Sequence, residues 1–136
     1  MSALKAPMGR TIFIGIALNS IFLTLNGVFM IVNPKTWYEV VPGVITTGFY
    51  NQHFIRDIGI VQLFLGIAFI VGWFRPTERL TLWGVATLWL IAHAIFHLWE
   101  VAVGICGPSA LLRDFVAVSL PAIIGTVAVF TNRTRN

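Results

Sequence analysis

Four apolar stretches of about 20 residues dominate the chain and constrain its fold more than any other feature. They cover residues 11–32, 54–74, 79–103 and 110–131, and each is long enough to cross a bilayer as an α-helix. Only 10% of the residues are charged, against roughly 25% in soluble domains. The 136 residues therefore predict a single domain (1–136), an all-α integral-membrane four-helix bundle in the lipid bilayer.

Proline and glycine mark the ends of these stretches. Asn33-Pro34, Arg75-Pro76 and Gly107-Pro108 separate one stretch from the next, because a residue before proline is biased away from the helix. The 75–78 connection is so short that the second and third stretches must form an antiparallel hairpin. Pro121 lies inside the fourth stretch, where we expect it to kink the helix.

The basic residues predict the orientation in the membrane. Six lie near the termini and the 75–78 turn (Lys5, Arg10, Arg75, Arg79, Arg133 and Arg135), and three lie on the opposite side (Lys35, Arg56 and Arg113). By the positive-inside rule both termini are cytoplasmic, and we expect a multi-pass protein of the bacterial inner membrane. The scattered cations form no patch for nucleic acid, despite a pI of about 10. One cysteine, Cys106, excludes an internal disulfide.

Ionisable residues gather at the outer ends of the second and third stretches. They are His53, Arg56, Asp57, His93, His97 and Glu100. Counted from the 75–78 turn, Asp57 and His97 lie at the same level, roughly 26 Å away. The spacing places the three residues of each stretch on one helix face. Since charged groups at membrane depth face protein or a wet cavity, we expect one pocket that opens to the periplasm. The second and third stretches build it, and the fourth is a further candidate because Arg113 and Asp114 begin it on the same side.

A metal ion is one ligand that this pocket could hold. The candidate ligands are His93, His97, Glu100, His53 and Asp57, a donor set that would suit zinc, copper or iron. Two histidines at i and i+4 are weak support by themselves. Arg56 beside them disfavours a cation.

A quinone, a haem or a small anionic ligand is the second possibility. Arg56 and the histidines are donors for a carbonyl or a carboxylate. His93 and His97 leave the same helix face, so they cannot both be axial ligands of one haem. A proton path across the membrane is not expected, because Gln62 is the only polar residue deep in the second stretch. We assign no catalytic residue and do not expect a stand-alone enzyme.

The third possibility is structural. The polar cluster can lock the helices together or dock a partner protein without binding any ligand. The residues to which we assign a structural polar role are Asn19, Asn26, Gln62, Arg113 and Asp114. Of these, Asn19 and Asn26 are expected to hydrogen-bond between helices.

Two segments resemble a known group of proteins. Residues 50–59 read YNQHFIRDIG, and residues 93–97 read HAIFH. They resemble small four-helix bacterial membrane proteins related to the DoxX-like families, which show N-x-H-[FL]-x-R-D-x-G in the second helix and H-x-x-F-H in the third. The first and fourth stretches match only in hydropathy. In that group a polar residue, often histidine, follows the second histidine of the third-helix motif three positions on, and this chain has Glu100 there.

The resemblance implies a redox-associated role at the level of quinones. DoxX-like relatives act in some cases as a subunit beside another polypeptide. We therefore expect a component of a larger membrane complex, or a homo-oligomer, whose pocket binds a metal ion or a quinone-type ligand.

Overall fold

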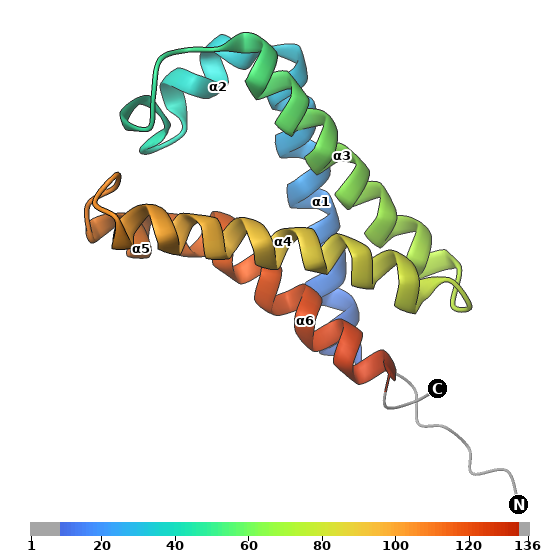
Figure 1. Ribbon diagram of the computed structural model, residues 1–136. Helices are drawn as coiled ribbons and strands as arrows, with labels where there is room; N and C mark the ends of the chain where they lie inside the picture. The colour runs from blue at the N-terminus through green and yellow to red at the C-terminus, as the bar shows by residue number, and fades with distance from the viewer. Residues whose placement is uncertain (1–8, 134–136) are drawn as a thin grey trace, which may run out of the picture.

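Helices joined by short connections make up the protein (Figure 1). The computed structural model describes residues 9–133, and these contain no β-strand. The elements are α1 (Arg10–Val32), α2 (Pro34–Val40), the 3-10 turn η1 (Val44–Thr46), α3 (Gln52–Phe74), α4 (Arg79–Ala102), α5 (Ser109–Asp114), the π-helical turn η2 (Phe115–Ser119) and α6 (Leu120–Arg133).

The four predicted stretches are confirmed as four helical segments long and apolar enough to cross a membrane. Their bounds are Arg10–Val32, Gln52–Phe74, Arg79–Ala102 and Ala110–Arg133. Large apolar side chains remain exposed along them, for example Leu25 and Phe64 at 64% and Val85 at 66%. Such a surface is stable against lipid but not against water.

The fourth segment is not one regular helix. It consists of α5, η2 and α6, and the N–H of Leu120 donates to the carbonyl of Phe115 across the π turn. Pro121 follows directly and has no N–H to donate, so the carbonyl four residues earlier lacks its usual α-helical partner. The irregularity expected from Pro121 thus takes the form of a π turn, a feature that often marks functional sites.

Glycines bring α1 and α3 into close contact. A Cβ atom on Gly27 would lie 2.6 Å from the carbonyl oxygen of Gly59 and 2.7 Å from the backbone nitrogen of Leu63. At the residue directly before Gly27, Asn26 donates to Gln62 Oε1 over 2.8 Å and accepts from Trp37 Nε1 over 2.9 Å. Close backbone approach and interhelical hydrogen bonds both favour the association of helices in lipid.

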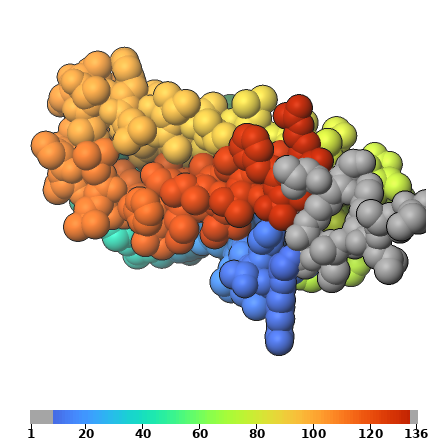
Figure 2. All heavy atoms as spheres, turned by 90° about the horizontal axis from the view of Figure 1, so that it is seen from below, coloured from blue at the N-terminus to red at the C-terminus, as the bar shows by residue number. Residues whose placement is uncertain are grey.

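A second helix pair consists of α4 and α6. Gly125 of α6 lies against the side chain of Thr87 in α4. Figure 2 shows the two helices side by side along one face of the molecule. Asn19 of α1 donates to the carbonyl of Pro121 over 3.2 Å and so ties this pair to the first.

The α3–α4 hairpin opens away from its turn. Near the turn, Trp83 Nε1 donates to the carbonyl of Phe69 over 3.0 Å, and both side chains are fully buried. Beyond that contact α3 follows α1 and α4 follows α6, so their outer ends diverge (Figure 1). The core, which includes Ile16, Leu23 and Leu90, lies where the four helices cross.

The molecule has two ends, which we name for use below. The turn end holds the start of α1, the 75–78 turn and the end of α6 (Figure 1). The loop end holds α2, the loop of residues 41–51, the 103–108 loop and α5.

Candidate functional site

The structure does not bring the six predicted pocket residues together. Those on α3 and those on α4 lie at the loop end, but on helices that have diverged (Figure 1). The physical reason is the pairing of helices: α3 packs on α1 through glycine contacts, whereas α4 packs on α6. A short turn makes two helices neighbours only near the turn itself.

The α3 group is a surface feature. His53 Nε2 and Asp57 Oδ2 are 3.2 Å apart within one helix, and their side chains are 87% and 56% exposed. Arg56 Nε donates over 3.1 Å to the carbonyl of Ile31 near the end of α1. These residues therefore pair on the surface and satisfy a helix-end carbonyl, a role that needs no ligand.

The α4 group finds its partner on α5. His97 Nδ1 lies 3.1 Å from Asp114 Oδ2, and these side chains are only 26% and 18% exposed. Arg113 binds the same carboxylate at two points, with Nε 2.6 Å from Oδ1 and Nη2 3.1 Å from Oδ2. A carboxylate facing Nδ1 orients the imidazole and leaves Nε2 as the ring nitrogen for a ligand.

Aromatic rings continue this cluster along α4. The ring centroid of His93 lies 4.7 Å from that of His97, with the rings nearly perpendicular. On its other side His93 stacks on Trp89 at 4.8 Å. Trp89, His93 and His97 are four residues apart on α4, so their rings form one continuous row. The row ends at the contact between His97 and Asp114.

Glu100 stands apart from the row. Among the residues that the structure describes, its side chain has no ion pair and no hydrogen bond to a side chain. Its carbonyl accepts the N–H groups of Ile105 and Cys106 and so closes the end of α4.

A small cavity lies between α4 and the α5–η2 segment. Its volume is about 180 Å³. The polar residues His97, Asp114 and Ser119 and the apolar residues Leu111, Phe115 and Val118 are among those that line it. We call it the loop-end cavity. Three of these residues belong to the π turn, so the irregular backbone before Pro121 shapes one wall of the cavity.

The 41–51 loop reaches this cluster through a glycine. Gly43 has φ of +86°, and a Cβ atom there would collide with the guanidinium of Arg113. The positive φ favours glycine, and the missing side chain leaves room for the guanidinium. Cys106 is buried and also lies against Arg113, so two loops and α5 meet at this one guanidinium.

The predicted metal ligands do not gather around one point. Within residues 9–133 no three His, Cys, Asp or Glu side chains are placed to share an ion. His53 and Asp57 are on α3, whereas His97 faces Asp114 across the α4–α5 connection. The structure therefore replaces the predicted five-residue set by a His97–Asp114–Arg113 cluster with His93 behind it.

Arg113 and Asp114 form the site together with His97. The sequence placed them on the same side as the predicted pocket but assigned them a structural polar role. The signal that could have revealed them is the 103–108 connection, which is nearly as short as the 75–78 turn. It makes the start of the fourth segment as close a neighbour of His97 as the hairpin partner. No pattern pointed to Trp89 or Ser119.

Comparisons with protein-family models, with curated proteins and with solved structures find no match to this chain.

Proposed function

We propose that the protein is a multi-pass protein of the bacterial inner membrane whose loop-end cavity binds the head group of a quinone-type ligand. The observation that carries the proposal is the His97–Asp114 contact in the wall of the cavity. An oriented imidazole in a mostly apolar hollow is suited to an aromatic ring that carries oxygen atoms.

The chemistry follows from the ring nitrogen that Asp114 leaves free. His97 Nε2 can accept the proton of a quinol hydroxyl in one redox state and donate to a quinone carbonyl in the other. A volume of about 180 Å³ holds a head group but no complete ligand, since drug-sized ligands occupy roughly 300 Å³ or more. Leu111 and Phe115, both exposed, would continue the apolar contact toward lipid.

A metal ion fits the cavity less well. His97 and Asp114 are the only two of its lining residues that commonly ligate transition metals. Arg113 holds both oxygens of Asp114, and its positive charge opposes a cation at the same place.

A larger redox complex is part of the proposal. Oxidation of a quinol releases two electrons and two protons, and the side chains at the cavity can move only the protons. A partner that takes up or supplies electrons is therefore required. The resemblance to DoxX-like proteins, which stays a prediction, points the same way.

The second candidate is an accessory subunit without a ligand. It is favoured by the saturation of Asp114, which accepts from Arg113 at both oxygens and faces His97 as well. In that case the cluster serves to fasten α4 to α5 and to the 41–51 loop.

Replacing His97 by alanine is expected to remove the ligand while the fold persists. Protein purified gently from native membranes should carry a quinone, measured by extraction, chromatography and absorbance, and H97A should carry at least about ten-fold less. His53→Ala is the matched control: it removes the same side chain from an exposed site and should leave the quinone content unchanged.

Two results would separate the two candidates, and a third tests the larger complex, which both candidates require. Equal quinone contents in H97A and H53A would contradict the ligand site. Wild-type protein that carries no quinone but melts at a higher temperature than H97A would support the accessory subunit. Co-purification of the wild type with a redox polypeptide would support the proposed complex.

The proposed orientation places the loop end in the periplasm and both termini in the cytoplasm. It rests on the excess of Arg and Lys at the turn end, where Arg10, Arg75, Arg79 and Arg133 lie. In a Cys106→Ser background, Ser109→Cys should react in intact cells with a thiol reagent that cannot cross the inner membrane. Thr77→Cys, also at an exposed position but at the turn end, should react only after the membrane is broken. The reverse pattern would contradict the orientation.

A further inference from the structure

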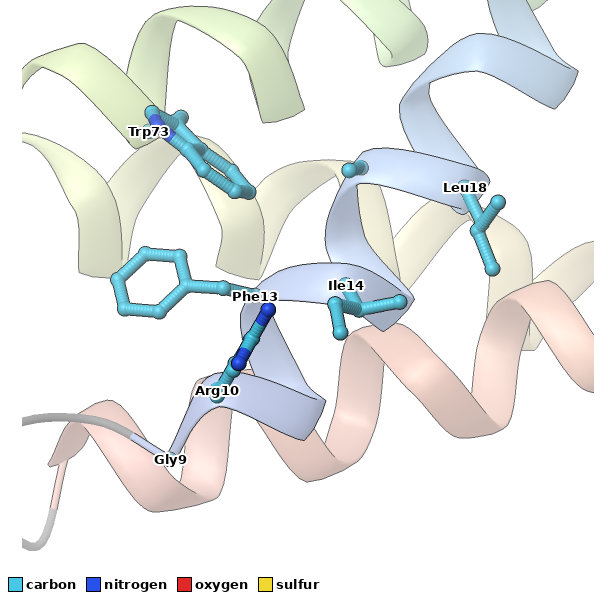
Figure 3. A pocket seen from close by; sticks show the side chains of 7 residues that line it. Gly9, Arg10, Phe13, Ile14, Leu18 and Trp73 are labelled. Carbon is cyan, nitrogen blue, oxygen red and sulfur yellow. The ribbon is translucent and has the colours of Figure 1, made fainter.

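A second hollow lies at the turn end, between the first turns of α1 and the end of α3 (Figure 3). Its volume is about 680 Å³. Phe13 and Trp73 pack edge to face at 4.8 Å in its wall, Ile14 and Leu18 extend it along α1, and Arg10 lies at its rim. We call it the turn-end groove. None of its residues belongs to the loop-end cavity.

The surroundings of the groove are positively charged. Besides Arg10, the guanidinium of Arg79 lies 5.4 Å from the Phe13 ring and donates to the carbonyls of Gly72 and Trp73. In the described part of the chain, no arginine of the turn end forms an ion pair with a carboxylate. The one acid there, Glu78, accepts from the Thr77 hydroxyl instead. The groove is therefore apolar inside and has unneutralised cations at its edge.

We propose that the turn-end groove binds a phospholipid whose head group carries a net negative charge. The phosphate lies at Arg10 and Arg79, and an acyl chain runs along Ile14, Ala17 and Leu18. Basic pockets between membrane helices on the cytoplasmic side bind anionic head groups in this manner. Tryptophan beside arginine is also typical of the depth at which head groups meet hydrocarbon.

Charge decides between this lipid and the other possible occupants. A zwitterionic lipid has its own cation, so it neutralises the arginines less well. A second copy of the chain would bring the same arginines to the interface, and like charges repel. Residues 1–8 contain Lys5 and no acid. If they occupied the turn-end groove, they would therefore add positive charge and not neutralise the arginines.

The test is native mass spectrometry of the full chain with phosphatidylglycerol and phosphatidylcholine supplied in equal amounts. Wild-type protein should retain phosphatidylglycerol in preference. Arg10→Gln should reduce that preference roughly five-fold, the effect expected of one basic residue at a membrane surface. Arg133→Gln is the matched control, because Arg133 is an exposed arginine at the same end that does not line the groove.

A second pair of variants tests the acyl chain. Ala17→Phe fills the groove and should reduce retention of phosphatidylglycerol at least five-fold, whereas Val28→Phe adds the same bulk at an exposed position of α1 outside the groove and should not. Equal retention of the two lipids by the wild type, or equal effects within either pair of variants, would overturn the proposal. So would retention of inorganic phosphate in place of lipid, or a dimer whose lipid content is independent of Arg10. Because the quinone content is measured separately, failure here leaves the proposed function unaffected.

Discussion

Replacing Gly27 by alanine is expected to lower the free energy of unfolding in detergent by about 1–3 kcal/mol. The added Cβ would lie 2.6 Å from the carbonyl oxygen of Gly59 and 2.7 Å from the nitrogen of Leu63. Both are backbone atoms of α3, so the clash can be relieved only if the two helices separate. Their separation would also weaken the Asn26–Gln62 hydrogen bond, which joins the residues directly before Gly27 and Leu63.

Gly84→Ala is the control for this prediction. Gly84 lies within α4, and a Cβ atom there would meet no neighbouring atom within 4 Å. Alanine in a helix interior is favoured over glycine by roughly 0.5–1 kcal/mol, so G84A should unfold at the same or a higher denaturant concentration than the wild type. If the two variants shift the unfolding midpoint alike, the close α1–α3 contact is not the source of stability that we describe.

Asp114→Asn is expected to cost roughly 1–3 kcal/mol of stability, because it removes the one negative charge that Arg113 and His97 share. The side chain is only 18% exposed, so water replaces the lost interaction incompletely. Thermal melting followed by circular dichroism in detergent measures the loss. Under the proposed function D114N should also lower the quinone content, since His97 loses the group that orients its ring.

The matched control is Asp57→Asn on α3. Asp57 also pairs with a histidine, but at 56% exposure, and exposed pairs contribute between about 0 and 1 kcal/mol. Its melting temperature should therefore remain close to that of the wild type. If D57N were as destabilising as D114N, the polar contacts that hold the helices would lie on α3, as the prediction of a single α3–α4 pocket implied.

Hydropathy and helix-breaking residues were sufficient to predict the secondary structure. The segments expected at 11–32, 54–74 and 79–103 differ from the observed helices by at most two residues at either end. The helix bounds can be predicted because they depend on local properties of the chain, namely the length of each apolar stretch and the position of proline. In the fourth segment the sequence predicted a kink at Pro121 but not its form, the π turn η2 that precedes this proline.

The site was predicted only in part. Depth counting from the 75–78 turn correctly assigned His53, Asp57 and His97 to one end of the molecule, since rise per residue is a property of the helix alone. It could not tell which helix lies opposite His97. Distances along a helix are known from sequence, whereas the angle between two helices is not.

By itself, then, the sequence determined four apolar helices, their ends and the level of each polar residue along them, because these depend on local covalent structure and on hydrophobic content. Only the tertiary structure decided that α3 packs on α1 and α4 on α6. That choice depends on glycines far apart in the chain, such as Gly27 and Gly59, which permit a close approach between particular faces. It separates His53 and Asp57 from His97 and gives His97 the carboxylate of Asp114 instead.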